Sequence, residues 1–317
     1  MHVSRQKLFL VTTLLGSVLL IVGFCADLVS ALDSRIVIIS SGRGKAYEET
    51  IEGLQATLRL QDGAVDYELH YEEGDPEKGM DFLRNLEQQG AAKLVVTLGS
   101  AATTAALRAN LRTPVVACMV LKPENFRPLN NATGVFLDFP IRTQFEWISE
   151  FLPHAKTVGV LYNPLENDGA IKQAQAVADE MGLTLVAKMV DTPEKLPRAM
   201  KSLGREVDVL WGVSDSVVLT PQTAKTILLF SFRNRIPFIG LSSQWVKAGA
   251  LYSLDRDYQD IGKQCGEIAV KILKGASADE VAPAPPRRII YSLNRKTADH
   301  MRVEIPDRLL QNAQEVF

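Results

Sequence analysis

One stretch, residues 93–107, limits the fold of this chain most strongly. It begins with Lys-Leu-Val-Val-Thr-Leu, continues with Gly-Ser and ends in an alanine-rich run. The first part is short, apolar and rich in β-branched residues, as expected of a parallel strand covered on both faces. Gly99 allows a tight turn, and Ser100 is a good N-cap for the helix that follows. The stretch therefore predicts a strand–turn–helix unit of a parallel α/β sheet.

The start of this predicted helix suits a small anion such as a carboxylate. Free backbone N–H groups and the positive end of the helix dipole meet there, and the hydroxyls of Ser100 and Thr103 lie in the first turn. An ordinary βα turn with a capped helix explains the same residues. The stretch alone leaves both interpretations open.

Strands and helices alternate in two series along the chain. The first series predicts strands at residues 35–41, 66–71, 93–98 and 115–120. Residues 131–140 interrupt the alternation and are expected to cross between two domains. The second series predicts strands at residues 157–162, 184–188, 207–213 and 237–240. Because short loops join alternating strands and helices, both series predict parallel sheets with helices on both faces.

The last part of the chain predicts two more passages between domains. Residues 250–254 suit a strand or a crossover, and a long helix with Ile261, Cys265, Ile268 and Ile272 on one face follows them. The proline-rich residues 282–286 form a stiff linker before a late strand at 289–293.

The N-terminus predicts an export signal. Basic residues within the first seven positions precede 17 uncharged residues, Leu8–Phe24, and small or compact residues end at Ala31. We expect cleavage after residue 31 and an exported, periplasmic or extracytoplasmic protein. An uncleaved membrane anchor is the alternative, although the apolar run is just below the length of a comfortable span. Lipid attachment at Cys25 is disfavoured, because bulky Phe24 precedes it.

Two cysteines remain after this segment, Cys118 and Cys265. An even number of cysteines in an exported protein allows a disulfide. Each, however, lies within an apolar pattern, where an isolated cysteine usually behaves as a core residue. We therefore expect two unpaired core cysteines.

Composition and motifs exclude several classes of function. With 317 residues, 46% of them hydrophobic and a net charge of −2, the chain is globular and has no nucleic-acid surface. Residues 42–45 lack the earlier Gly and the Ser or Thr of a phosphate loop. Residues 212–216 lack the closing Gly of a nucleophile elbow. No zinc-type spacing is present, so we expect no metal, no cofactor and no enzymatic activity.

Six motifs, in order along the chain, carry a resemblance to a known family. They are Val96–Ala102, Asn131–Val135, Val158–Pro164, Lys247–Leu251, Asp257–Gly262 and Ile272–Gly275. The chain resembles the substrate-binding components of ABC transporters that have the type I periplasmic-binding-protein fold. Within these it is similar to the subgroup that includes tryptophan- and tyrosine-type amino-acid binders. The resemblance runs from about residue 35 to the end.

The resemblance implies an α/β fold with two doubly wound parallel-sheet lobes joined by a three-crossover hinge. We expect lobe 1 at residues 32–138 with about 254–284, and lobe 2 at 139–253 with about 285–317. The chain departs from the family at residues 121–128, where an Asp-Pro pair and a Gly-rich loop are usual. This departure affects the expected ligand class more than the fold.

The candidate ligand-binding residues follow from the rule that open α/β sheets bind ligands outside the carboxyl ends of their strands. In lobe 1 they are Ser40, Ser41, Gly99, Ser100 and Thr103. In lobe 2 they are Tyr162, Asn163, Ser214, Asp215 and Ser242, and Asp138 and Ser253 lie near the crossings. We expect Ser100, Thr103 and nearby N–H groups to hold a ligand carboxylate, Asp215 an ammonium group, and Tyr162 an apolar face.

Each of these residues has a structural alternative. Asp215 equally suits a cap, Tyr162 a core position, and the serines caps and turns. Trp211 and Trp245 suit the cleft less well than the core.

The predicted function is a monomeric receptor that binds an amino acid or similar carboxylate in the cleft between the lobes. The resemblance implies that the lobes close over this ligand by hinge motion. The expected partner is an ABC permease in the inner membrane. A ligand-sensing module for a membrane signalling protein is the alternative, and an enzyme on the same fold is a more distant one.

Overall fold

The computed structural model describes residues 35–60, 66–72, 75–121, 131–204 and 206–317. The predicted signal segment lies outside these residues. So does Lys122–Pro128, which is most of the stretch where the sequence departs from the family pattern. The described chain forms two compact units. Unit 1 comprises the described residues up to Asp138 together with Tyr258–Pro286, and unit 2 comprises Phe139–Asp257 and Arg287–Phe317. The chain thus passes three times between the units. The sequence prediction put these passages near residues 138, 254 and 285.

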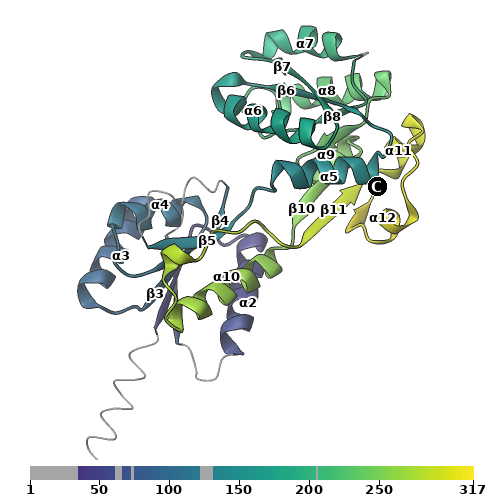
Figure 1. Cartoon of the computed structure of the whole chain (residues 1–317). Helices are drawn as coiled ribbons and strands as arrows, with labels where there is room; N and C mark the ends of the chain where they lie inside the picture. The colour runs from purple at the N-terminus through teal and green to yellow at the C-terminus, as the bar shows by residue number, and fades with distance from the viewer. Residues whose placement is uncertain (1–34, 61–65, 73–74, 122–130, 205) are drawn as a thin grey trace, which may run out of the picture. The chain divides into compact units, whose positions relative to one another are not determined.

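Unit 1 is a five-stranded parallel sheet with helices on both faces (Figure 1). Its elements are β1 (Ile36–Ser40), α2 (Lys45–Arg59), β2 (Tyr67–Tyr71), α3 (Pro76–Gln89), β3 (Leu94–Leu98), α4 (Ser100–Ala109), β4 (Val115–Val120), β5 (Ala132–Phe136), α10 (Tyr258–Leu273) and the short η3 (Ala278–Glu280). The strand order is β2-β1-β3-β4-β5.

Alternate residues of the central strands enter two hydrophobic layers. Ile36 and Ile38 of β1 pack with the apolar faces of α2 and α10. Val37 and Ile39 of the same strand pack with α3 and α4. Every residue of β1 and β3 is buried, which explains why both strands are continuous apolar runs rather than alternating ones.

The strand order of unit 1 places a topological switch point between β1 and β3. The chain leaves β1 through α2 toward β2, and returns through α3 to β3 on the other side of β1. The helices after β1 and β3 therefore cover opposite faces of the sheet. At such a topological switch point the loops after the two strands diverge, and open α/β sheets bind their ligands there.

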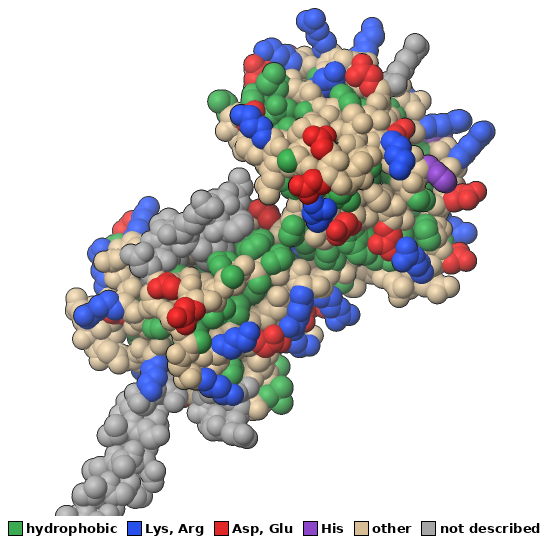
Figure 2. All heavy atoms as spheres, in the orientation of Figure 1, with side chains coloured by type: hydrophobic (Ala, Val, Ile, Leu, Met, Phe, Trp, Pro, Cys, Tyr) green, Lys and Arg blue, Asp and Glu red, His purple; other side chains and the backbone are tan. Residues whose placement is uncertain are grey.

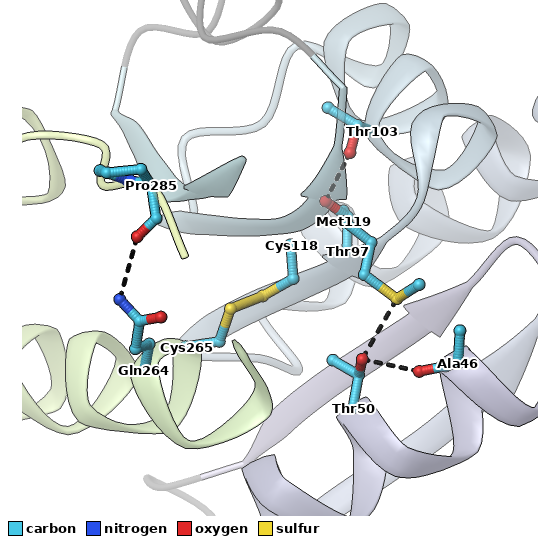
Figure 3. The surroundings of a disulfide bond; sticks show 9 residues. All are labelled: Ala46, Thr50, Thr97, Thr103, Cys118, Met119, Gln264, Cys265 and Pro285. Carbon is cyan, nitrogen blue, oxygen red and sulfur yellow. Dashed lines mark hydrogen bonds between the residues drawn. A yellow bond between two sulfur atoms is a disulfide. The ribbon is translucent and has the colours of Figure 1, made fainter. Parts of the chain in front are cut away.

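A disulfide joins Cys118 of β4 to Cys265 of α10 (Figure 3). The expectation of two unpaired core cysteines is therefore wrong. Both residues are fully buried in the layer that α10 shares with the sheet. Their separation of 147 residues spans all of the first segment of unit 2, so local sequence patterns gave no sign of their proximity.

Unit 2 contains a seven-stranded sheet with the order β12-β11-β10-β9-β8-β6-β7. Its first elements are α5 (Ile141–Phe151), β6 (Thr157–Tyr162), α6 (Pro164–Glu180), β7 (Thr184–Met189), η2 (Pro193–Lys195), α7 (Leu196–Leu203), β8 (Val209–Trp211) and α8 (Pro221–Asn234). The later ones are β9 (Phe238–Gly240), α9 (Ser243–Ala248), β10 (Tyr252–Arg256), β11 (Ile289–Leu293), α11 (Arg295–Met301), α12 (Asp307–Gln311) and β12 (Glu315–Val316).

The sheet of unit 2 has its own switch point, between β6 and β8, because β7 lies beyond β6 at one edge. Most of its strands are parallel, but β11 runs antiparallel to β10. The core of this unit includes Trp211, which packs edge-on against Phe145 and donates a hydrogen bond to Gln144. Trp245 lies partly buried against Phe238. Both tryptophans thus contribute to packing, as the sequence favoured.

Some element boundaries differ from the sequence prediction. Helix α3, predicted from the sequence at residues 81–89, begins at Pro76, five residues earlier, because the Asp75 side chain caps it and Pro76 occupies its first position. Strand β5 was not predicted, because residues 131–140 were expected only to cross between domains. Helix α9 and the C-terminal α11, α12 and β12 were not predicted either. They are short elements, whose periodicity is too brief to be recognised.

The surface of both units mixes charges of both signs on the face that Figure 2 shows. In the part of the chain that the structure describes, no helix is long and apolar enough to cross a membrane.

Candidate functional site

The switch point of unit 1 brings together the loop after β1, the turn at Gly99 and the start of α4. Ser41 donates its backbone N–H to the carbonyl of Leu98 at 2.9 Å. Its hydroxyl accepts a hydrogen bond from the N–H of Ala102 at 2.8 Å. Gly99, rather than Ser100, is the N-cap of α4 and makes no side-chain cap. The capping oxygen predicted at Ser100 is instead supplied by Ser41, which lies 58 positions before Gly99 in the printed sequence.

Gly99 is required where it stands. Its φ of +91° is in the region that favours glycine. A Cβ there would lie 2.7 Å from the Tyr47 hydroxyl and 2.9 Å from the Ser41 hydroxyl. Two hydroxyls therefore approach the turn because this position has no side chain.

The first turn of α4 keeps hydrogen-bonding capacity. The N–H of Ala102 is taken by Ser41, and that of Thr103 by the Gly99 carbonyl. Within the described residues, the N–H groups of Ser100 and Ala101 have no acceptor, and the Ser100 side chain is exposed. Two free N–H groups, a hydroxyl and the positive end of a ten-residue helix can bind both oxygens of a carboxylate.

Two other predicted residues of unit 1 have structural roles. The Thr103 hydroxyl is buried, lies 2.9 Å from the Thr97 hydroxyl and donates to the Gly99 carbonyl (Figure 3). The Ser40 hydroxyl donates to the Gly42 carbonyl and closes the turn after β1. Both therefore position the turn rather than point outward. Asp138, the last residue of the first segment of unit 1, is half-buried.

The switch point of unit 2 is closed by its own hydrogen bonds. Asp215 is 7% exposed and accepts four of them. One oxygen accepts from the Asn163 N–H at 2.6 Å and the Asn167 amide at 3.0 Å, and the other from the N–H groups of Val217 and Val218 at 2.8 Å. These fill the four acceptor positions of a carboxylate, so the capping alternative for Asp215 describes its contacts.

The neighbours of Asp215 are equally engaged. Asn163 caps α6 through its side-chain oxygen and donates to Glu166. The Ser214 carbonyl accepts from Asn167, while its side chain is exposed. The structure thus brings Asn163, Ser214 and Asp215 together, as a satisfied polar network.

The remaining predicted residues of unit 2 are spread along its sheet. Tyr162 is 7% exposed and packs in the core, so the core alternative describes it. Ser242 precedes α9 without making a side-chain cap. Ser253 is fully buried in β10, and its hydroxyl has no hydrogen-bond partner among the described residues.

The sequence analysis missed two residues near this turn: Tyr47, whose hydroxyl lies against Gly99, and Glu72, whose charge acts on Tyr47. Tyr47 lies in the first turn of α2, not at the end of a strand, so the strand-end rule did not select it. Glu72 directly follows β2, an early strand whose carboxyl end supplied no candidate residue. The signal that identifies Glu72 is therefore the same strand-end rule that selected Ser41 and Ser100.

Burial and charge shift the pKa values of both residues in the same direction. Burial raises the pKa of the Glu72 carboxyl, the Ser41 hydroxyl opposes this by favouring the charged form, and the Asp75 charge adds to the rise. Burial also raises the pKa of Tyr47, and the negative charge of Glu72 raises it further. No cluster of three or more His, Cys, Asp or Glu in the described residues could hold a metal ion.

Comparison with known proteins identifies the family of this chain. The family described as "ABC transporter substrate binding protein" matches residues 35–317. A tyrosine-binding protein of Clostridioides difficile is 25% identical over 197 residues, which cover 59% of this chain and 56% of that protein. The match thus spans little more than half of that relative.

Two solved structures show the same fold. A ligand-free, open substrate binding protein with adhesive properties from Clostridium difficile has a TM-score of 0.74 and 22% identity, covering 89% of this chain and 99% of its own. An ABC domain from Streptococcus pneumonia in complex with L-Trp has a TM-score of 0.58 and 23% identity, covering 90% and 99%. The predicted α/β fold of the type I periplasmic binding proteins is confirmed. The chain belongs to the ABC transporter substrate binding protein family.

Proposed function

We propose that this protein is the extracytoplasmic solute-binding component of an ABC transporter, and that its ligand is an amino acid, most simply an aromatic one. The observation that carries the proposal is the start of α4. There the N–H groups of Ser100 and Ala101 and the Ser100 hydroxyl are free at a topological switch point. A ligand carboxylate would bind there.

The names of the relatives support an aromatic amino acid. One relative is named for tyrosine, and one solved structure contains L-Trp. We extend the proposal to the remaining functional steps expected from the sequence: the ligand is bound between the two units, a hinge at the three chain passages closes over it, and a permease receives it. Unaltered ligand would be recovered after binding.

The decisive test compares two substitutions at one position. Ser100→Pro removes both the hydroxyl and the N–H, and proline is tolerated at the first position of a helix. Ser100→Ala removes only the hydroxyl and is the matched control. Hydrogen bonds to a charged group contribute about 1.5–3 kcal/mol. We therefore expect S100P to weaken binding of L-Tyr or L-Trp about tenfold or more relative to S100A in isothermal titration calorimetry.

Binding of a ligand analogue, stabilisation by the ligand and uptake by cells give results that could contradict the proposal. L-Tyrosinamide, which lacks the carboxylate, should bind weakly to the wild type and equally to both variants. A ligand at about 100 times its Kd should stabilise the wild type by roughly 2.7 kcal/mol. Equal affinity of S100P and S100A for L-Tyr would rule out the α4 site, and absence of stabilisation by any amino acid would rule out the ligand class. Ligand uptake that does not depend on the gene would contradict the transport role.

A further inference from the structure

Glu72 is a buried carboxylate whose oxygens have no hydrogen-bond partner among the described residues. Its side chain is 1% exposed. It directly follows β2, and its backbone N–H donates to the Ser40 carbonyl at 3.1 Å, which fixes it beside the carboxyl end of β1. Burial of a charged group without a partner is costly, so a residue of this kind calls for a specific explanation.

The fold provides space for this carboxylate. Gly79 of α3 has no side chain, and a Cβ there would overlap the Glu72 Oε2 atom and contact Ala105 of α4. The carboxylate therefore lies between β1, α3 and α4, in a space that alanine at position 79 would fill. Glu72 can keep this position only because residue 79 has no side chain.

Glu72 is also connected to the proposed carboxylate site. The Ser41 hydroxyl interacts with its charged form and accepts from the Ala102 N–H of α4. Ser41 and Tyr47 both lie against Gly99. We call Ser41, Tyr47, Glu72 and Gly99 the Gly99 cluster. In it, two hydroxyls lie against the glycine at the start of α4, and the Glu72 carboxylate is related to them through Ser41.

The described charges nearby do not neutralise Glu72. Asp75 is itself negative and disfavours the charged form of Glu72. Arg43, in the loop after β1, lies over the ring of Tyr71, 3.7 Å from its centroid. The cluster and the start of α4 therefore offer two features that a zwitterion requires: a carboxylate that no described charge neutralises, and the free N–H groups of Ser100 and Ala101.

We propose that Glu72 binds the ammonium group of the ligand, beside the carboxylate site at the start of α4. This inference rests on the proposed function and deepens it. It assigns both charges of the ligand to unit 1, and it replaces Asp215, whose four acceptor positions are already occupied, as the partner of the ammonium group. The ligand class is an α-amino acid rather than a plain carboxylic acid.

The test uses the purified full-length protein and the pair Glu72→Gln and Glu68→Gln. Glu68 lies on β2, the strand that Glu72 follows, and forms an ion pair with Arg35, so E68Q is the matched control. The probes are L-tyrosine and 3-(4-hydroxyphenyl)propionate, which lacks only the amino group. Wild type and E68Q should prefer L-tyrosine, and E72Q should lose about tenfold or more of that affinity, as expected for a bond to a charged group. Binding of the des-amino compound should not fall.

A second measurement separates a binding role from a structural one. If the role of Glu72 is to bind the ligand, E72Q should melt at the same temperature as the ligand-free wild type or higher, because the substitution removes an unpaired buried charge. Gly79→Ala should displace the carboxylate and weaken L-tyrosine binding as E72Q does. Failure of E72Q to fold, or a lower melting temperature, would mean that Glu72 is structural and would overturn the proposal.

The outcomes also distinguish this inference from the proposed function. Unchanged preference of E72Q for L-tyrosine, with normal binding, would overturn the role of Glu72 alone. Failure of wild type and E68Q to bind any amino acid would overturn the proposed function and this inference with it.

Discussion

Glu72 and Asp215 are both buried acids that follow strands, yet their surroundings are opposite. Asp215 accepts four hydrogen bonds from neighbouring N–H and amide groups. Glu72 accepts none within the described part of unit 1. Because a carboxylate is stabilised by the donors around it, Asp215 is suited to hold a turn, whereas Glu72 is suited to bind a group from outside.

The raised pKa of Glu72 predicts how stability depends on pH. A carboxyl group whose pKa is higher in the folded than in the unfolded chain binds its proton more tightly when folded. Its stabilising effect is therefore complete below the unfolded pKa and is lost as pH rises through the folded pKa. We expect ligand-free E72Q to gain stability over the wild type as pH rises from the acidic range to neutral. Urea unfolding at several pH values measures this.

The control for this pH dependence is E68Q, which removes a carboxylate from a half-exposed ion pair. The difference in the free energy of unfolding between E68Q and the wild type should not grow with pH in the same direction. If the free energies of unfolding of E72Q and the wild type differed by a constant amount from acidic to neutral pH, Glu72 would have the same pKa in the folded and the unfolded chain.

At the scale of elements, α2 and α10 pack closely, although 198 residues lie between Arg59, the end of α2, and Tyr258, the start of α10. A Cβ on Gly53 of α2 would overlap the carbonyl of Gln259, and one on Gly262 of α10 would overlap that of Thr50. Both positions lie where backbone meets backbone, which cannot give way as a flexible side chain can. Glycine at these two points is therefore a requirement of helix packing.

We predict that Gly262→Ala destabilises the protein by about 1–3 kcal/mol or more, because overpacking forces the two helices apart. Gly169→Ala is the matched control, since Gly169 lies in α6 with no atom within 4 Å of its Cβ position. It should stabilise by about 0.5–1 kcal/mol through helix propensity. Denaturant unfolding distinguishes them, and similar effects of both substitutions would contradict the close contact.

At the scale of the whole molecule, the last segment of unit 1 follows the first and longer segment of unit 2 in the sequence. Helix α10 belongs to unit 1 and packs in its core with α2. The Cys118–Cys265 disulfide fixes this late segment to β4 across 147 residues of chain. Cross-linking a long loop restricts the unfolded chain and so favours the folded one.

We predict that the Cys118→Ala/Cys265→Ala double variant loses about 2–5 kcal/mol of stability, the usual effect of removing a native disulfide. Urea unfolding with and without reductant measures it. Reductant should destabilise the wild type and leave the double variant unchanged. A wild type that is insensitive to reductant under unfolding conditions would contradict the bond.

The sequence by itself determined the α/β fold, most of the strands and the presence of two alternating series. These are properties of local pattern: apolar β-branched runs, helical periodicity and turn residues. It also determined the turn at Gly99 and the helix start after it, since glycine, serine and alanine in that order favour one local conformation. The short C-terminal elements escaped prediction because they contain too few residues to establish a period.

Only the tertiary structure decided how the candidate residues are used. Whether a serine caps a helix, or an acid is satisfied, depends on donors from other elements, as Ser41 with Ala102 and Asp215 with Asn163 show. The disulfide and the glycine contacts of α2 with α10 likewise join residues that are distant in sequence. Met119 is a further example: its backbone has a positive φ where the register between β4 and β5 shifts, and this depends on the neighbouring strand. The physical reason is the same throughout: burial and hydrogen bonding are set by neighbours in space, which a linear pattern does not contain.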